Sequence, residues 1–143
     1  MLPATTPSFE TVSQELRTFG ARHPEIQAVF VFGSIAAGTT HTGSDVDVAV
    51  LTHDETEDGQ SLDRRLAYTI ELEDRLNTLV DVAMLNSAGP MLRFQVLRKG
   101  KLVYSTDANR TRRFKGAALV EFYDEIVMLE AMQKRAIRRL IGR

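Results

Sequence analysis

An apolar segment that opens on two aspartates constrains this chain more than any other feature. Residues 45–51 read DVDVAVL, a run rich in β-branched residues that is too short for a typical helix. Alternate side chains of a strand face the same side, so Asp45 and Asp47 project together, with Cα atoms roughly 6.5 Å apart. The valines of the segment face the other way and predict a buried side. The segment is therefore predicted to be a strand that carries two like charges at its start.

Short strands and amphipathic helices alternate along the rest of the sequence. In chain order we expect a helix from Thr6-Pro7 to near His23-Pro24, a strand at 26–32, an antiparallel partner strand at 45–51, a helix capped by Ser61, and a strand at 80–85. A short helix then follows Gly89-Pro90 and stops at Gly100. KLVYS is expected to be an edge strand or an extended segment, and a helix that Gly116 interrupts runs from about Asp107 to the end.

This order of elements predicts an α+β fold, with a small mixed β-sheet flanked by helices and a long C-terminal helix. A chain of 143 residues has room for one core, so residues 1–143 are expected to form a single domain, with 107–143 as its C-terminal helical segment. Two apolar stripes are expected to pack on the body. They are Leu62, Leu66, Ile70, Leu76 and Leu79 in one helix, and Leu119, Phe122, Ile126, Leu129, Met132, Ala136 and Leu140 in the last.

Composition excludes several classes of protein. The formal net charge of −1 gives no global attraction to nucleic acid or to membranes, and the absence of cysteine excludes disulfides and thiolate metal sites. No apolar run is long enough to span a bilayer, and the N-terminus lacks a secretion signal. We expect a cytoplasmic protein that makes no membrane contact and does not bind nucleic acid directly.

The paired aspartates predict a metal site. Two carboxylates this close repel each other unless a cation relieves them, and oxygen ligands of this type suit Mg²⁺ or Mn²⁺. Asp81 is the second residue of the later strand LVDVAML. If that strand lies beside 45–51, Asp81 completes a three-carboxylate site, which can hold two ions that clamp a triphosphate for in-line displacement.

A Gly-Ser pair follows the first strand and predicts a phosphate site. Gly33 has no Cβ, so a phosphate can approach its backbone, and the Ser34 hydroxyl adds a donor. If residues 34–37 begin a helical turn, the free N–H groups of that turn face the same anion. Each of these signals is weak alone, since Gly-Ser turns and single strand aspartates are common, and their order along the chain makes them specific.

The stretch GSIAAGTTHTGSDVDVAVL, followed by VDVAML, resembles the polymerase-β-type nucleotidyltransferases, and its short form resembles their minimal branch. The resemblance implies that Gly33 and Ser34 bind the nucleotide phosphates, that Asp45, Asp47 and Asp81 hold the metals, and that Asp81 also helps to activate the incoming hydroxyl. One position departs from the family pattern Gly-Ser-x-Ala-Arg-Gly, because Ala37 stands where the arginine is usual. Arg93 or Lys99 is a candidate substitute for that cation.

The resemblance also implies a function. Minimal nucleotidyltransferases are commonly antitoxins that transfer AMP from ATP to a tyrosine of a small helical HEPN ribonuclease toxin, so we expect a metal-dependent adenylyltransferase with such a partner. Two alternatives stay open. One is a catalytically weak antitoxin that neutralises its partner by binding alone, which Ala37 favours, and the other is a small-molecule nucleotidyltransferase of the aminoglycoside type, which the short chain disfavours.

Other polar and aromatic residues have weaker claims to function. His41 is interpreted as a solvated loop residue, and His23 and His53 show no partner pattern. The basic cluster near the C-terminus fits a solvated helix end, since cations are favourable there. Several apolar residues of the last segment are interpreted as core rather than as a docking surface. These are Phe114, Phe122, Tyr123, Met128, Leu129 and Met132.

Overall fold

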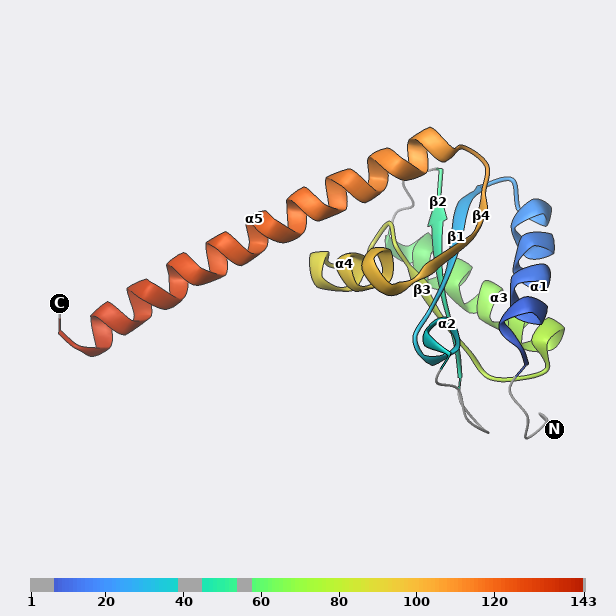
Figure 1. The fold of residues 1–143 in the computed structure, drawn as a ribbon, viewed down its shortest axis with the longest axis horizontal. Coiled ribbons are helices and arrows are strands. Elements are labelled where there is room, and N and C mark those ends of the chain that lie inside the picture. The colour runs from blue at the N-terminus through green and yellow to red at the C-terminus, as the bar shows by residue number, and fades with distance from the viewer. Residues whose placement is uncertain (1–6, 39–44, 54–57, 143) are drawn as a thin grey trace.

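The computed structural model describes residues 7–38, 45–53 and 58–142. Figure 1 shows a four-stranded sheet with helices on both of its faces. The helices are α1 (Phe9–Arg22), α2 (Ser34–Ala37), α3 (Asp58–Leu76), α4 (Pro90–Lys99) and α5 (Ala108–Leu140). The strands are β1 (Ile26–Phe32), β2 (Val46–Thr52), β3 (Val80–Met84) and β4 (Lys101–Ser105). Among the described helices, none is both long and apolar enough to cross a membrane.

The sheet is mixed, as the sequence predicted. Its strand order is β3-β2-β1-β4, with β1 antiparallel to both β2 and β4, and β2 parallel to β3. The parallel pair is possible because α3 carries the chain back between β2 and β3. The α+β fold class and the edge position of β4 are therefore confirmed.

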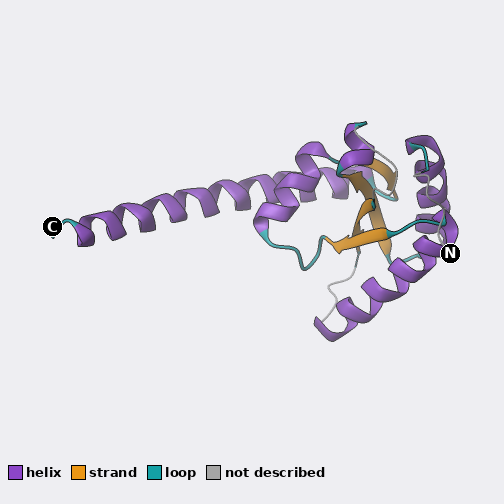
Figure 2. Ribbon diagram, turned by 90° about the horizontal axis from the view of Figure 1, so that it is seen from below, coloured by secondary structure: helices purple, strands orange, loops and turns teal. Residues whose placement is uncertain are grey.

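Alternating side chains of the strands divide the core into two layers. Val48 and Val50 of β2 face α1 and α3, where they pack with Leu16 and Leu72. The opposite face of the sheet packs on α4 and the start of α5. Its buried residues are Ala28, Phe30, Ala49, Leu51, Leu85 and Val96. Figures 1 and 2 show the same division, with α1 and α3 on one side of the sheet and α4 and α5 on the other.

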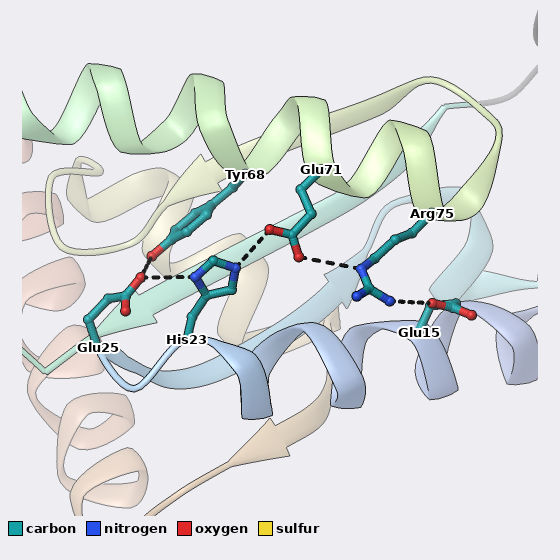
Figure 3. Close-up of polar contacts among 6 residues, drawn as sticks. All are labelled: Glu15, His23, Glu25, Tyr68, Glu71 and Arg75. Carbon is teal, nitrogen blue, oxygen red and sulfur yellow. Dashed lines mark hydrogen bonds and ion pairs between the residues drawn. The ribbon is translucent and has the colours of Figure 1, made fainter.

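A chain of polar contacts joins α1 to α3 (Figure 3). His23 lies between two carboxylates, with Nε2 2.9 Å from Glu71 Oε1 and Nδ1 3.3 Å from Glu25 Oε2. The Tyr68 hydroxyl donates to Glu25 at 2.5 Å. Arg75 continues the chain by pairing with both Glu71 and Glu15. The sequence showed no partner pattern for His23, yet it has two partners, because Glu25 lies two residues away and Glu71 lies 48 residues away on another helix.

Two predicted helix caps differ from the structure. Ser8, rather than Thr6, caps α1, since its side chain accepts a hydrogen bond from the Thr11 N–H at 3.2 Å. Thr6 itself lies outside the described residues. Helix α3 begins at Asp58, so Ser61 lies within the helix and does not cap it. A capping residue and the first turn of a helix have similar sequence preferences, and the sequence left the choice between them ambiguous.

The predicted buried stripe of α3 was confirmed at Leu76 and wrong at its other four residues. Leu62, Leu66 and Ile70 are exposed, while the buried face consists of Tyr68, Leu72 and Leu76. Both sets repeat every four residues, but they are offset by two positions, which is roughly 200° around a helix. Only one of them can face the sheet. Leu79 lies beyond the end of α3 and is likewise exposed.

Helix α5 is continuous through Gly116 and extends far from the sheet (Figure 2). Its Asp107 cap accepts hydrogen bonds from the N–H groups of Asn109 and Arg110. Only its first turns reach the body, where Phe122 stacks on Phe94 of α4 with ring centroids 3.8 Å apart. The prediction of a core stripe along the whole helix was therefore wrong. The large side chains that α5 and the residue after it expose are Leu119, Val120, Tyr123, Val127, Met128, Leu129, Met132, Ile137, Leu140 and Ile141.

Candidate active site

Two of the predicted aspartates lie side by side on neighbouring strands. Asp47 of β2 and Asp81 of β3 are paired in the parallel register, and Asp47 is also paired with Phe32 of β1. Directly paired residues share a face of the sheet, so Phe32, Asp47 and Asp81 form a row across three strands. Asp45 immediately precedes β2 and is exposed. The prediction that the strand of Asp81 lies beside the strand of Asp47 is confirmed.

The Gly33-Ser34 turn closes over this row. Gly33 has φ 73° and ψ −152°, a backbone conformation that is essentially restricted to glycine. A Cβ at this position would lie 2.0 Å from Asp47 Oδ2, so the turn and the carboxylate fit only because the side chain is absent. Ser34 begins α2, which confirms the predicted helical turn at 34–37. The turn predicted to bind phosphate is thus in contact with the carboxylate predicted to bind metal.

The carboxylates repel one another. Burial raises the pKa of Asp47 above its ordinary value, and the negative charges of Asp81 and Asp45 raise it further. A cation placed among these groups would reverse the effect, since it favours the ionised form of each. The electrostatics of the site therefore fit a divalent ion, and the donor atoms are the hard oxygens that Mg²⁺ and Mn²⁺ prefer.

The carboxylates of the described residues do not form a complete three-ligand metal site. Within the part of the chain that the structure describes, no three acidic or histidine side chains converge closely enough to hold one ion. Asp47 is central to the site, because it is the residue whose pKa responds to both neighbours.

Arg65 is a site residue that the sequence analysis missed. It belongs to α3, and its Nε donates to the Val82 carbonyl of edge strand β3 at 2.7 Å. Its Nη2 lies 3.6 Å from Asp81 Oδ1. The hydrogen bond to the Val82 carbonyl therefore holds the Arg65 guanidinium next to Asp81. This carbonyl can accept it because β3 is an edge strand of the sheet. No sequence signal distinguishes Arg65 from the neighbouring Arg64, because the distinction depends on which face of α3 meets β3.

Arg93 and Lys99 were the two candidates for the cation that the family pattern has at position 37, and the structure distinguishes between them. Arg93 donates to the carbonyls of Leu85 and Asn86, both at 2.8 Å, and pairs with Glu121 at 3.1 Å. These partners lie past the end of β3 that is opposite Asp81, so the structure does not place Arg93 beside the carboxylates. Lys99 ends α4 beside Gly100, whose backbone approaches Phe32, and Lys99 stays a prediction. His41 lies outside the described residues.

Comparison with known proteins agrees with this site. The family model described as polymerase beta, nucleotidyltransferase matches residues 14–109, which include β1, β2 and β3 together with the turn between β1 and β2. The chain belongs to the polymerase β nucleotidyltransferase family. The predicted fold and family are thereby confirmed, and the row of Phe32, Asp47 and Asp81 lies within the matched segment.

Individual proteins of known activity or structure are similar to this chain. The protein adenylyltransferase MntA of Shewanella oneidensis is 35% identical over 85 residues, which are 58% of this chain and 57% of that protein. The aligned part thus spans little more than half the length of this curated relative. A chain of a toxin-antitoxin structure solved with AMP-PNP is 26% identical, with a TM-score of 0.64 over 94% of this chain and 99% of that chain.

A further solved structure shares the fold. It contains a tri-AMPylated Shewanella oneidensis HEPN toxin in complex with an MNT antitoxin. The match has a TM-score of 0.61 and 22% identity, and it covers 93% of this chain and 98% of that chain. A match of this extent includes most of α5, because α5 accounts for 33 of the 143 residues.

Proposed function

We propose that this protein is a minimal nucleotidyltransferase that transfers AMP from ATP to a tyrosine hydroxyl of a small helical HEPN ribonuclease and thereby acts as its antitoxin. Family membership supports nucleotidyl transfer. The likeness to MntA, which is a protein adenylyltransferase, supports a protein acceptor. The likeness to toxin-antitoxin complexes supports the kind of partner. The cytoplasm is the compartment we propose for this activity.

One observation carries the proposal. The Gly33 turn and the paired Asp47 and Asp81 meet at one end of the sheet, where the backbone of Gly33 closes directly over Asp47. A phosphate bound at the turn would therefore lie next to the carboxylates. Proximity of this kind is what a nucleotidyl transfer needs, since positioning and charge neutralisation supply most of its catalysis.

The residues have separate roles in the proposed reaction. Gly33 and Ser34 bind the phosphates of ATP, and Asp45, Asp47 and Asp81 hold the divalent ion. Mg²⁺ or Mn²⁺, when bound, neutralises the phosphate charge. The tyrosine oxygen forms a bond to the α-phosphorus, the bond from that phosphorus to the bridging oxygen breaks, and pyrophosphate leaves. Asp81 accepts the phenolic proton, because it is the carboxylate at the outer end of the row.

The exposed surface of α5 supports a stable protein partner. Val127, Met132 and Leu140 are 65%, 57% and 86% exposed, and they belong to a run of large apolar side chains on a helix that projects from the body (Figure 1). Apolar surface of this extent marks a site of protein association. The basic residues Lys134, Arg135, Arg138 and Arg139 lie among the apolar residues of the last turns of the helix. A partner helix with an apolar face and an acidic end fits this arrangement.

Intact-mass spectrometry tests the proposal. The HEPN protein encoded beside this chain is incubated with it, ATP and Mg²⁺, and we expect added AMP mass on the partner together with loss of its ribonuclease activity. The matched variant is Asp45→Asn/Asp47→Asn, which keeps the side-chain volumes and removes the charges. We expect this variant to add no AMP.

The second candidate function is neutralisation by binding alone. It is favoured by Ala37, an exposed apolar residue that stands where the family pattern resembled by this sequence often has an arginine. Neutralisation without added mass, equal in the wild type and in the Asp45/Asp47 variant, would establish it in place of adenylylation.

A further inference from the structure

A cleft opens beside Asp81, on the outer edge of the sheet. Its volume is about 490 Å³, and it is bounded by the edge strand β3, the start of α3 and the start of α4. Asp81 and Arg65 supply its charged wall. The other side chains that matter here are Phe32, Leu62, Ala88 and Leu92. A cleft of this size accommodates an aromatic side chain with its flanking backbone.

The order of the strands indicates from which side an acceptor would approach the carboxylates. The phosphate turn follows β1, Asp47 lies on β2, and Asp81 lies on β3, which is the edge strand. In nucleotidyl transfer the attacking oxygen and the leaving oxygen lie in line on opposite sides of the phosphorus. A pyrophosphate held at the turn after β1 therefore requires an acceptor that approaches from the β3 side. The cleft extends from Phe32 at the end of β1 to Asp81 and Arg65, so it reaches the β3 side of the carboxylates.

The walls of the cleft suit an aromatic ring that ends in a hydroxyl. Leu62 and Leu92 are 57% and 36% exposed, although both are large apolar residues, so they offer surface that a ring can cover. Phe32 adds an aromatic side chain in the same row as the two aspartates. Apolar walls that end at a carboxylate match a phenol, which has an apolar ring and one polar atom. An aliphatic hydroxyl or a sugar would leave these walls uncovered.

Arg65 adds a positive charge beside Asp81 in the cleft. Its guanidinium is held by the Val82 carbonyl and lies 3.6 Å from Asp81. A fixed cation at this point stabilises the phenolate that forms as the proton leaves. We propose that this cleft is the acceptor subsite and that it binds the tyrosine ring, with the phenolic oxygen between Asp81 and the α-phosphate. This inference rests on the proposed function and names the substrate pocket within it.

A small phenol tests the cleft without the partner protein. N-acetyltyrosinamide is the probe, and N-acetylphenylalaninamide is its analogue without the hydroxyl. With ATP and Mg²⁺ we expect AMP transfer to the tyrosine probe. We expect the phenylalanine analogue to inhibit competitively against that probe and noncompetitively against ATP, since the ring supplies the binding. Saturation-transfer NMR with AMP-PNP in place of ATP should show ring contacts for both probes, which is a readout independent of turnover.

Two substitutions fill the cleft from its α4 side, Ala88→Trp just before the helix and Leu92→Trp in its first turn. We expect each to raise KM for the tyrosine probe by about tenfold or more and to leave the Kd for ATP within about twofold. The control is Ala21→Trp, which adds the same side chain at an exposed position of α1, a helix on the other face of the sheet. Thermal unfolding by circular dichroism identifies any variant that fails to fold.

The possible results distinguish a failure of the proposed acceptor subsite from a failure of the proposed function. If both filled variants fold and modify the probe as well as Ala21→Trp does, the acceptor binds elsewhere and the inference is overturned, while the proposed function stands. If the wild type modifies neither the probe nor the HEPN partner, the proposed function fails and the subsite fails with it.

Discussion

Gly33 approaches Asp47 so closely that a Cβ on the glycine would lie 2.0 Å from a carboxylate oxygen. Gly33 directly follows β1 and Asp47 lies on the neighbouring strand β2, and the positive φ of Gly33 would strain any other residue. We predict that Gly33→Ala lowers the free energy of unfolding by about 1–3 kcal/mol and displaces Asp47. Urea unfolding gives the first quantity, and ATP titration calorimetry should show weakened binding. Gly38→Ala is the control, because Gly38 also has positive φ but open space around its Cα. Equal ATP binding by the two variants would contradict the prediction.

Asp47→Asn removes the carboxylate whose pKa both neighbours raise. We predict that it weakens binding of Mg²⁺-ATP by about tenfold or more, because the charge that offsets the cation is lost. Calorimetry measures this, and excess EDTA should reduce the wild type to the affinity of the variant. Asp74→Asn on the exposed side of α3 is the matched control. Unchanged ATP affinity in Asp47→Asn, with Mg²⁺ present, would remove Asp47 from the site.

For Asp81→Asn the expected defect is in transfer rather than in binding. Asp81 lies on the acceptor side of the row, so nucleotide affinity should largely survive while the rate of AMP transfer falls by about 10²-fold or more. Single-turnover kinetics at saturating ATP separates the two steps. A variant that transfers AMP at the rate of the wild type would make Asp81 a structural residue.

Leu129→Glu tests α5 as the partner-binding surface. Leu129 is 47% exposed, so the substitution should not disturb the fold, yet it places a charge within an apolar contact. We predict a Kd for the HEPN partner that is raised about tenfold or more. Gln133→Glu adds the same charge one turn later without removing an apolar side chain, and its effect should be smaller. Biolayer interferometry measures both, and identical affinities would place the partner elsewhere.

The contact between Glu25 and Tyr68 predicts a pH-dependent stability. Burial by itself raises the pKa of Glu25, but the hydrogen bonds from Tyr68 and from its own backbone and the charges of His23 and Arg64 outweigh it, so its pKa lies below the ordinary 4.5. The folded state therefore favours the ionised form. That contribution is fully present above about pH 4.5 and is lost as the pH falls through the lowered value.

We accordingly predict that Glu25→Gln lowers the free energy of unfolding by about 1 kcal/mol at pH 7. The deficit should shrink between pH 4.5 and pH 3, because the wild type then loses the same charge. Urea unfolding at the three pH values measures it, with Glu10→Gln on the exposed side of α1 as the control. A deficit that is constant with pH would show that packing, and not charge, connects Glu25 to Tyr68.

The sequence by itself determined most of the elements and the place where the site forms. Strand β1 was predicted at its observed limits, and the run of valines in 45–51 fixed which side of β2 is buried, because a period of two leaves no other choice. The spacing of Gly33, Asp47 and Asp81 predicted that they meet at one end of the sheet. Local patterns sufficed here, because each strand has a single way to bury its apolar face.

Only the tertiary structure decided the features for which the local pattern is degenerate. Two stripes of α3 have the same spacing, and contact with the sheet selected the one that contains Leu72. Arg65 lies beside Asp81 because β3 is an edge strand whose Val82 carbonyl accepts a hydrogen bond from it. His23 contacts Glu71, which belongs to a distant helix. The apolar residues of α5 satisfy the pattern of a core helix, yet the body is too small to cover them. Burial depends on what else is nearby in space, which periodicity along the chain does not specify.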